Sequence, residues 1–182
     1  MHPSNKEFIH AFPGDLHDDA IVALSTLPEN PLPSPIFTAA VTGQIVVLPY
    51  RIYHDTALID TSSLRTLQKE IVDSLLTRHN DGFVRQQYLT RIIALDHVWI
   101  PPFVIQLIGE YVVEILEVIQ RNLKFLDTPV YREFLQANPE LLATTKQRVA
   151  SYWDCYYRNR GREEYVGFQV LDFLESVNVK SQ

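Results

Sequence analysis

The stretch "LRTLQKEIVDSLLTRHNDGFVRQQYLTRIIAL" (64–95) decides the fold, because it holds two runs in which an apolar residue recurs at every third or fourth position. This period places the apolar side chains of each run on one face of a helix. The residues that share the spacing are Leu64, Leu67, Ile71 and Leu75 in the first run, and Val84, Tyr88, Ile92 and Leu95 in the second. The stretch therefore predicts two amphipathic helices that meet at a short corner.

The corner itself, "TRHNDGFVR" (77–85), contains Arg, His and Asp residues and so resembles an active site at first sight. An Asn-Asp-Gly run tolerates left-handed backbone angles, and Asp81 precedes the second helix at a position suited to capping it. A carboxylate there also favours the positive end of the helix dipole. We therefore interpret this segment as a tight corner between helices.

The same 32 residues resemble one HEAT repeat, in which an apolar helix is followed by a short turn with Asp and by a Val-Arg pair that opens the second helix. Here those residues are Asp81, Val84 and Arg85. The resemblance implies a helical scaffold that binds protein or nucleic acid along a concave face. The chain shows no second copy at a fixed period, although stable solenoids usually need about three or more repeats.

Helical patterns continue to the end of the chain. Pro101-Pro102 should open a helix reaching about residue 123, and Thr128-Pro129 and Asn138-Pro139 each read as a cap followed by proline at the first helical position. The last helix should turn Val166, Val170, Leu174 and Val177 inward.

The first 60 residues hold short helices, a proline-rich connector (28–35) and one extended segment (44–53), and Ser34-Pro35 should begin a short helix that ends at Gly43. We expect a single all-α domain over 1–182, either a compact multi-helix bundle or a short HEAT-like solenoid. Residues 1–60 would form its N-terminal part and residues 61–182 its main body.

Composition narrows the class of partner. The net charge of −6 and the pI of about 5.5 argue against a general affinity for nucleic acid or for anionic lipid.

A single cysteine, Cys155, excludes an intrachain disulfide and fits a reducing compartment. The apolar span 98–119 carries three glutamates, and the start of the chain lacks an apolar leader. We expect a cytoplasmic protein without a membrane segment.

The densest aromatic and basic segment is "RVASYWDCYYRNRGR" (148–162). Residues 146–162 contain five Lys and Arg and one Asp, so 5 − 1 = +4. Helical spacing aligns Val149, Trp153 and Tyr156 as a core face, which assigns these rings to packing. The arginines Arg148, Arg158 and Arg160 remain as the best candidates for a contact surface.

A second candidate contact is the extended segment "PYRIYHD" (49–55). Strand alternation would send Arg51 and Tyr53 to one side, where they could line a pocket. Arg51 could equally pair with an acidic group at a helix end, and the sequence does not separate the two.

Histidines next to aspartates support an alternative function for the chain, in which they bind metal ions. They resemble the ligands of the all-α HD phosphohydrolases, in which imidazole and carboxylate groups hold divalent ions that activate water. The residues in question are His17, His54, Asp55, His79 and Asp81. The resemblance departs from that family because His54-Asp55 follows a proline-containing extended segment, whereas the family's dipeptide lies within a helix.

The chain lacks a Gly-rich phosphate loop, a Gly-x-Ser-x-Gly elbow and zinc-type Cys/His spacing. We therefore expect a non-enzymatic interaction or scaffold module that binds another protein and needs no cofactor. The metal-dependent phosphohydrolase is the alternative. A weaker third hypothesis makes the arginines and tyrosines of 148–162 a site for RNA or a phosphate ligand, whose affinity would fall steeply with salt.

Overall fold

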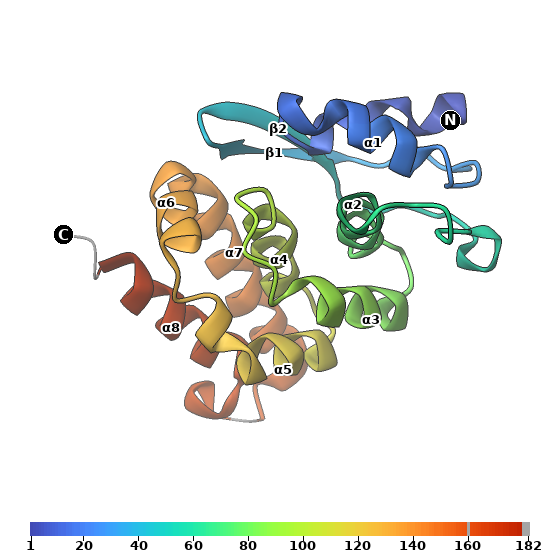
Figure 1. Cartoon of the computed structure of the whole chain (residues 1–182). Helices are drawn as coiled ribbons and strands as arrows, with labels where there is room; N and C mark the ends of the chain where they lie inside the picture. Colours follow the sequence, from blue (N-terminus) through green and yellow to red (C-terminus); the bar gives the residue numbers. More distant parts are fainter. Residues whose placement is uncertain (160, 180–182) are drawn as a thin grey trace. The chain divides into compact units, whose positions relative to one another are not determined.

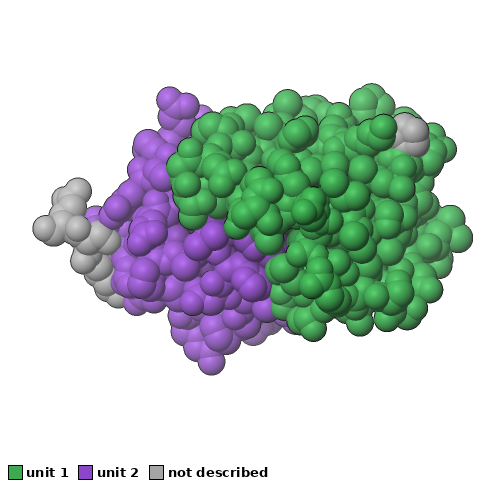
Figure 2. Space-filling model, turned by 45° about the horizontal axis from the view of Figure 1, so that its top comes forward, with its two compact units in different colours: residues 1–88 green, residues 89–182 purple. Residues whose placement is uncertain are grey.

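Helices dominate the described part of the chain, as the period of its apolar residues predicts, and the strands of that part form one β-hairpin (Figure 1). The computed structural model describes residues 1–159 and 161–179. These residues form two compact units, Met1–Tyr88 and Leu89–Gln182, which Figure 2 shows in green and purple. The boundary near residue 60 that the sequence suggests, between an N-terminal part and a main helical body, lies inside the first unit.

The first unit begins with short helices and the hairpin, followed by the first long helix of the 64–95 stretch. Its elements are η1 (Pro3–Ala11), η2 (Gly14–Leu16), α1 (His17–Leu24), β1 (Ile36–Val41), β2 (Gln44–Pro49), η3 (Thr56–Leu58) and α2 (Thr66–Leu76). The start of α3 (Gly82–Ile92) also belongs to it. Helix α1 packs against α2, where Asp19 accepts hydrogen bonds from Arg65 at 2.5 Å and from Gln68 at 2.8 Å.

Residues 36–41 form a strand, so the expected helix between Ser34 and Gly43 is wrong. Thr42 and Gly43 both have positive φ, 47° and 80°, which makes a two-residue turn whose twist suits a hairpin. The turn pairs β1 with β2 in antiparallel register, with Val41 opposite Gln44 and Phe37 opposite Leu48. The glycine that would end a helix instead closes a hairpin, and η1 packs against β2.

The regular elements of the second unit, over its described residues, are all helices. It contains the end of α3, then α4 (Pro101–Ile108), α5 (Val113–Arg121), η4 (Leu123–Phe125), α6 (Pro129–Ala137), α7 (Pro139–Tyr152), the π-helix η5 (Trp153–Tyr157), η6 (Arg162–Glu164) and α8 (Val166–Val179). Helix α8 packs on α5, α6 and α7 (Figure 1). Val170, Leu174 and Val177 are fully buried, as the sequence predicts, whereas Val166 at the start of α8 is half-buried.

The long helix expected over 101–123 is wrong, because the chain leaves helical geometry between Ile108 and Val113. Gly109 lies against α7, where a Cβ would stand 3.1 Å from Cδ of Arg148. A side chain at this break would therefore displace Arg148 by a few tenths of an ångström, which glycine avoids. None of the helices in the described part of the chain is long and apolar enough to cross a bilayer.

Candidate binding surface

The most unusual local geometry of the second unit is the π-helix η5, which continues α7 from Trp153 to Tyr157. A π-helix closes hydrogen bonds from i to i+5, so each turn holds more residues than an α-turn and the side chains beyond it rotate away from the α-helical face. Val149 stays in the core, Trp153 is half-buried, and Tyr156 is 67% exposed. The expectation that Tyr156 packs in the core is therefore wrong.

Three tyrosines from two places in the sequence gather at this end of α7. Tyr111, in the break between α4 and α5, lies 5.9 Å from Tyr152 between ring centroids, and Tyr152 lies 6.3 Å from Tyr156. The rings of Tyr152 and Tyr156 are nearly parallel, at 24°. Tyr111 is 53% exposed, and Tyr152 between them is half-buried. We call Tyr111, Tyr152 and Tyr156 the tyrosine surface.

A second aromatic layer lies beside the tyrosine surface. The ring of Tyr157 stacks on buried Tyr165 with centroids 4.9 Å apart, and its hydroxyl donates a long hydrogen bond, 3.5 Å, to the carbonyl of Tyr111. Tyr165 in turn meets Phe168 of α8 edge-on at 5.9 Å. Burial, followed by the nearby Tyr157 and Tyr152, raises the pKa of Tyr165 to about 12. This layer ties η5 to α8 and so holds the tyrosine surface in place.

Two of the predicted arginines lie next to these rings in sequence. Arg148, one helical turn before Tyr152, is half-buried with its aliphatic part against Gly109. Arg158 is exposed just after η5 and is ion-paired with Asp154 one turn earlier. Arg160 lies outside the described residues. The sequence pattern thus predicts the arginines of this region as contact residues, whereas it assigns Tyr156 to the core and does not single out Tyr111.

The other predicted pair, Arg51 and Tyr53, lies in the first unit on an extended segment. Both are half-buried, while the intervening Ile52 is buried. The backbone N–H of Arg51 donates to Oγ of Ser34 at 2.8 Å, and that of Tyr53 donates to Oδ1 of Asn30 at 2.7 Å. These bonds anchor the segment to the proline-rich connector, and a binding role for the two side chains stays a prediction.

The predicted metal ligands are only partly brought together. Ile52 forms a parallel bridge with His79, which places His54 next to the α2–α3 corner. Nε2 of His79 donates to the carbonyl of His54 at 2.9 Å, and its Nδ1 accepts from the N–H of Asp81 at 3.0 Å. Both nitrogens of His79 are therefore engaged by the backbone.

The carboxylates nearby serve as caps. Asp81 accepts from the N–H of Phe83 at 2.8 Å, as the sequence predicts, and Asp55 accepts from Ala57 at 3.0 Å. His17 lies elsewhere in the first unit, bonded to the carbonyl of Phe12 at 3.1 Å. Within 1–159 and 161–179, no three His, Cys, Asp or Glu residues are grouped so that they could hold a metal ion. The phosphohydrolase alternative stays a prediction without a ligand set in this part of the chain.

The chain matches no protein-family model, no curated protein and no solved structure. The HEAT-like resemblance of residues 64–95 therefore rests on the sequence pattern and on the observed helix pair α2 and α3 alone.

Proposed function

We propose that this chain is a non-enzymatic helical module that binds another protein through the tyrosine surface. The observation that carries the proposal is the exposure of Tyr111 and Tyr156 on a supported aromatic layer. Tyrosine is enriched where proteins meet, because its large ring buries much apolar area while its hydroxyl stays able to hydrogen-bond. A tyrosine already held in place also loses little conformational freedom on binding.

Arginines near the tyrosines in sequence also support a protein-binding role. Arginine, like tyrosine and tryptophan, is enriched at binding hot spots, and Arg148 and Arg158 flank the aromatic rings along the chain. The chain as a whole carries −6 while residues 146–162 carry +4, so the rest of the chain sums to −6 − 4 = −10. The segment 146–162 thus has a charge opposite in sign to that of the remaining sequence, which favours a partner with acidic groups. Two of its cations, Lys146 and Arg158, are ion-paired with Glu175 and Asp154.

The test compares capture of partners by three forms of the tagged protein: wild type, the double variant Tyr111→Ser/Tyr156→Ser, and Phe83→Ser. Phe83 is 80% exposed in the first unit and so supplies a matched loss of one exposed ring. Truncating a hot-spot tyrosine costs about 2 kcal/mol of binding, or about 30-fold in Kd. We expect a set of proteins retained by wild type and by Phe83→Ser, and depleted at least about 30-fold by the double variant.

Unchanged melting temperatures of the variants would show that exposed rings were removed without unfolding. Equal retention by all three forms would contradict the proposal. The RNA hypothesis is checked in the same experiment by nuclease treatment and by raising the salt, because binding through phosphates weakens steeply with ionic strength. Loss of every retained protein on nuclease treatment would assign the surface to nucleic acid instead.

A further inference from the structure

A cavity of about 610 Å³ opens in the second unit where α6, α7 and the end of α8 meet. Leu135 of α6 and Leu142 of α7 are buried and form its apolar wall together with the exposed Val179 of α8. Sites for small molecules in proteins measure roughly 300–1,000 Å³ and are lined mainly by apolar side chains. The cavity therefore has the size and the apolar wall of a small-molecule site.

A tight turn between α6 and α7 holds two sides of the cavity together. Asn138 separates the two helices, and its side-chain amide donates to the carbonyl of Phe134 at 2.8 Å. Pro139 follows as the first residue of α7, where its missing N–H costs no helical hydrogen bond. The turn thus fixes Leu135 and Leu142 on adjacent helices.

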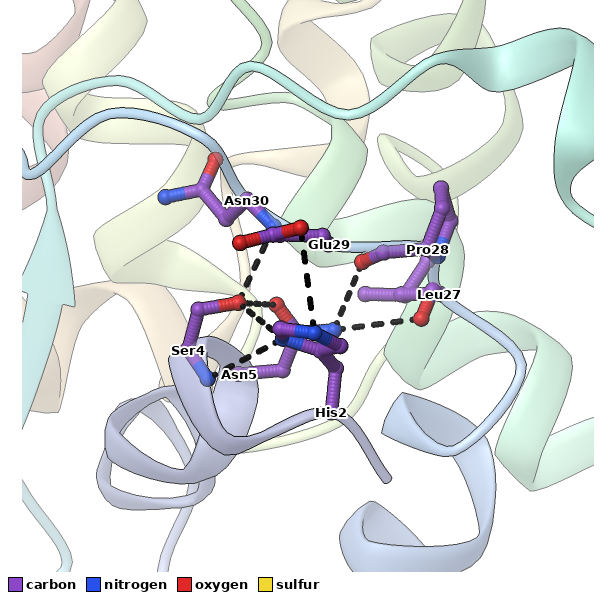
Figure 3. A network of polar contacts seen from close by, with 7 residues as sticks. All are labelled: His2, Ser4, Asn5, Leu27, Pro28, Glu29 and Asn30. Carbon is purple, nitrogen blue, oxygen red and sulfur yellow. Dashed lines mark hydrogen bonds and ion pairs between the residues drawn. The ribbon is translucent and has the colours of Figure 1, made fainter.

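Asn178 contributes an unpaired polar group to the lining. Its Oδ1 is buried and has no hydrogen-bond partner among the described residues. By contrast, the buried amide of Asn5 in the first unit donates to the carbonyls of Leu27 and Pro28, at 3.1 and 2.8 Å (Figure 3). An unpaired buried acceptor costs stability, and the terminal torsion of asparagine is broad enough for the amide to turn toward the cavity. A donor on a bound molecule would therefore give this oxygen the partner that the chain does not supply.

The charges at the cavity cancel one another. Lys146 is the one charged side chain among the described residues that line the cavity, and its Nζ lies 2.7 Å from Oε1 of Glu175. An anionic ligand would compete with Glu175 for this ammonium group, and a cationic ligand would meet no carboxylate among those lining residues. A ligand of either charge would also lose hydration against the apolar wall. The cavity therefore suits an uncharged ligand.

We propose that this cavity binds a small uncharged molecule with an apolar body and a hydrogen-bond donor, such as an aliphatic primary amide. The apolar body lies against Leu135, Leu142 and Val179, and the donor pairs with Oδ1 of Asn178 once its amide has turned. The cavity lies beside the first half of α7, whereas the tyrosine surface lies at the other end of that helix. The inference therefore does not rest on a protein-binding role of the tyrosine surface.

Titration of the full chain with three probes of equal chain length tests the class of ligand. The probes are hexanamide, hexanoate and hexylammonium, and NMR follows the methyl groups of Leu135, Leu142 and Val179. We expect hexanamide to shift these signals saturably, with a Kd in the low-millimolar range, and the two charged probes to bind at least about tenfold more weakly. The methyl groups of Leu24, in the first unit, serve as the reference. No saturable shift with hexanamide, or equal affinity for all three probes, would overturn the proposal.

A pair of tryptophan variants locates the bound probe. Ala143→Trp places a large ring at the cavity from an exposed position of α7, so the core stays intact. Thr144→Trp is the matched control, because it adds the same ring at the next exposed position, which is not part of the lining. We expect Ala143→Trp to weaken hexanamide binding at least about tenfold, and Thr144→Trp to change the Kd less than about twofold. An equal Kd in the two variants would overturn the assignment of the probe to this cavity.

A third variant tests the role of the unpaired amide. Asn178→Leu keeps the size of the side chain and removes its hydrogen-bonding groups, so the Kd for hexanamide should rise about fivefold. A Kd unchanged from that of the wild-type chain would overturn the pairing of the ligand with Asn178.

Discussion

Replacing Gly167 with alanine should destabilise the second unit by about 2–3 kcal/mol, in the upper part of the usual range of about 1–3 kcal/mol for overpacking a core. A Cβ on Gly167 would lie 2.6 Å from Cε1 of Tyr165 and 2.9 Å from Cγ1 of Val149. Both neighbours are buried, so neither can move without displacing the aromatic layer between η5 and α8. The chain's two tryptophans, Trp99 and Trp153, lie in this unit and report its urea unfolding by fluorescence.

Gly161→Ala is the matched control, because the nearest atom to its added Cβ is 3.9 Å away, an ordinary contact. Gly161→Ala should change the free energy of unfolding by less than about 0.5 kcal/mol. Since Tyr165 supports Tyr157, Gly167→Ala should also reduce the near-ultraviolet circular dichroism of the aromatic layer and weaken partner capture. Equal stability of the two alanine variants would contradict the tight packing of Tyr165 and Val149 against Gly167.

Replacing Arg85 with methionine should destabilise the first unit by about 3 kcal/mol. Arg85 is 1% exposed, and its Nη1 donates to the carbonyls of His79 at 2.8 Å and Asn80 at 2.9 Å. Methionine fills a similar volume but donates nothing, so two carbonyls of the corner lose a charged donor, and each hydrogen bond to a charged group is worth about 1.5–3 kcal/mol. Amide exchange of α2 in the full chain measures the loss within this unit.

Gln87→Met is the control, since it makes a comparable substitution on the exposed face of α3. We expect it to change stability by less than about 0.5 kcal/mol. The stability of Arg85→Lys should fall in between, because lysine keeps the charge but its shorter side chain does not place a donor where Nη1 of Arg85 contacts the carbonyls of His79 and Asn80. An Arg85→Met variant as stable as Gln87→Met would mean that the corner does not depend on this side chain.

Arg85 also shows where the sequence pattern stops being informative. The three- and four-residue spacing predicted both α2 and α3, and Ile71, Leu75 and Ile92 are fully buried. The pattern assigned Val84 to the buried face, yet Val84 is half-buried and the adjacent Arg85 is buried. Backbone carbonyls at the end of a corner can bind a buried cation, and the spacing of apolar residues in a sequence does not predict where such carbonyls lie.

The remaining errors concern places where the backbone departs from a regular helix. The hairpin over 36–49 depends on the turn at Thr42 and Gly43, the break after Ile108 lies against Arg148 of α7, and the π-helix η5 packs Trp153 against Phe168 of α8. Ala39 and Ala40 suit a helix by propensity, but the turn at Thr42 and Gly43 brings them opposite β2. In the candidate site the arginines could be named from composition, whereas the exposure of Tyr111 and Tyr156 follows from irregular backbone at both positions.

The most direct test of the tyrosine surface is site-specific photo-crosslinking in the cell of origin, with benzoylphenylalanine placed at position 156 and, separately, at position 83. Both positions are well exposed, and the two differ in the unit that carries them. We expect a discrete, light-dependent protein adduct from position 156 that is absent from position 83 and is lost when Tyr111→Ser is added. The same adducts from both positions, or none from position 156, would contradict the assignment of a protein-binding role to this surface.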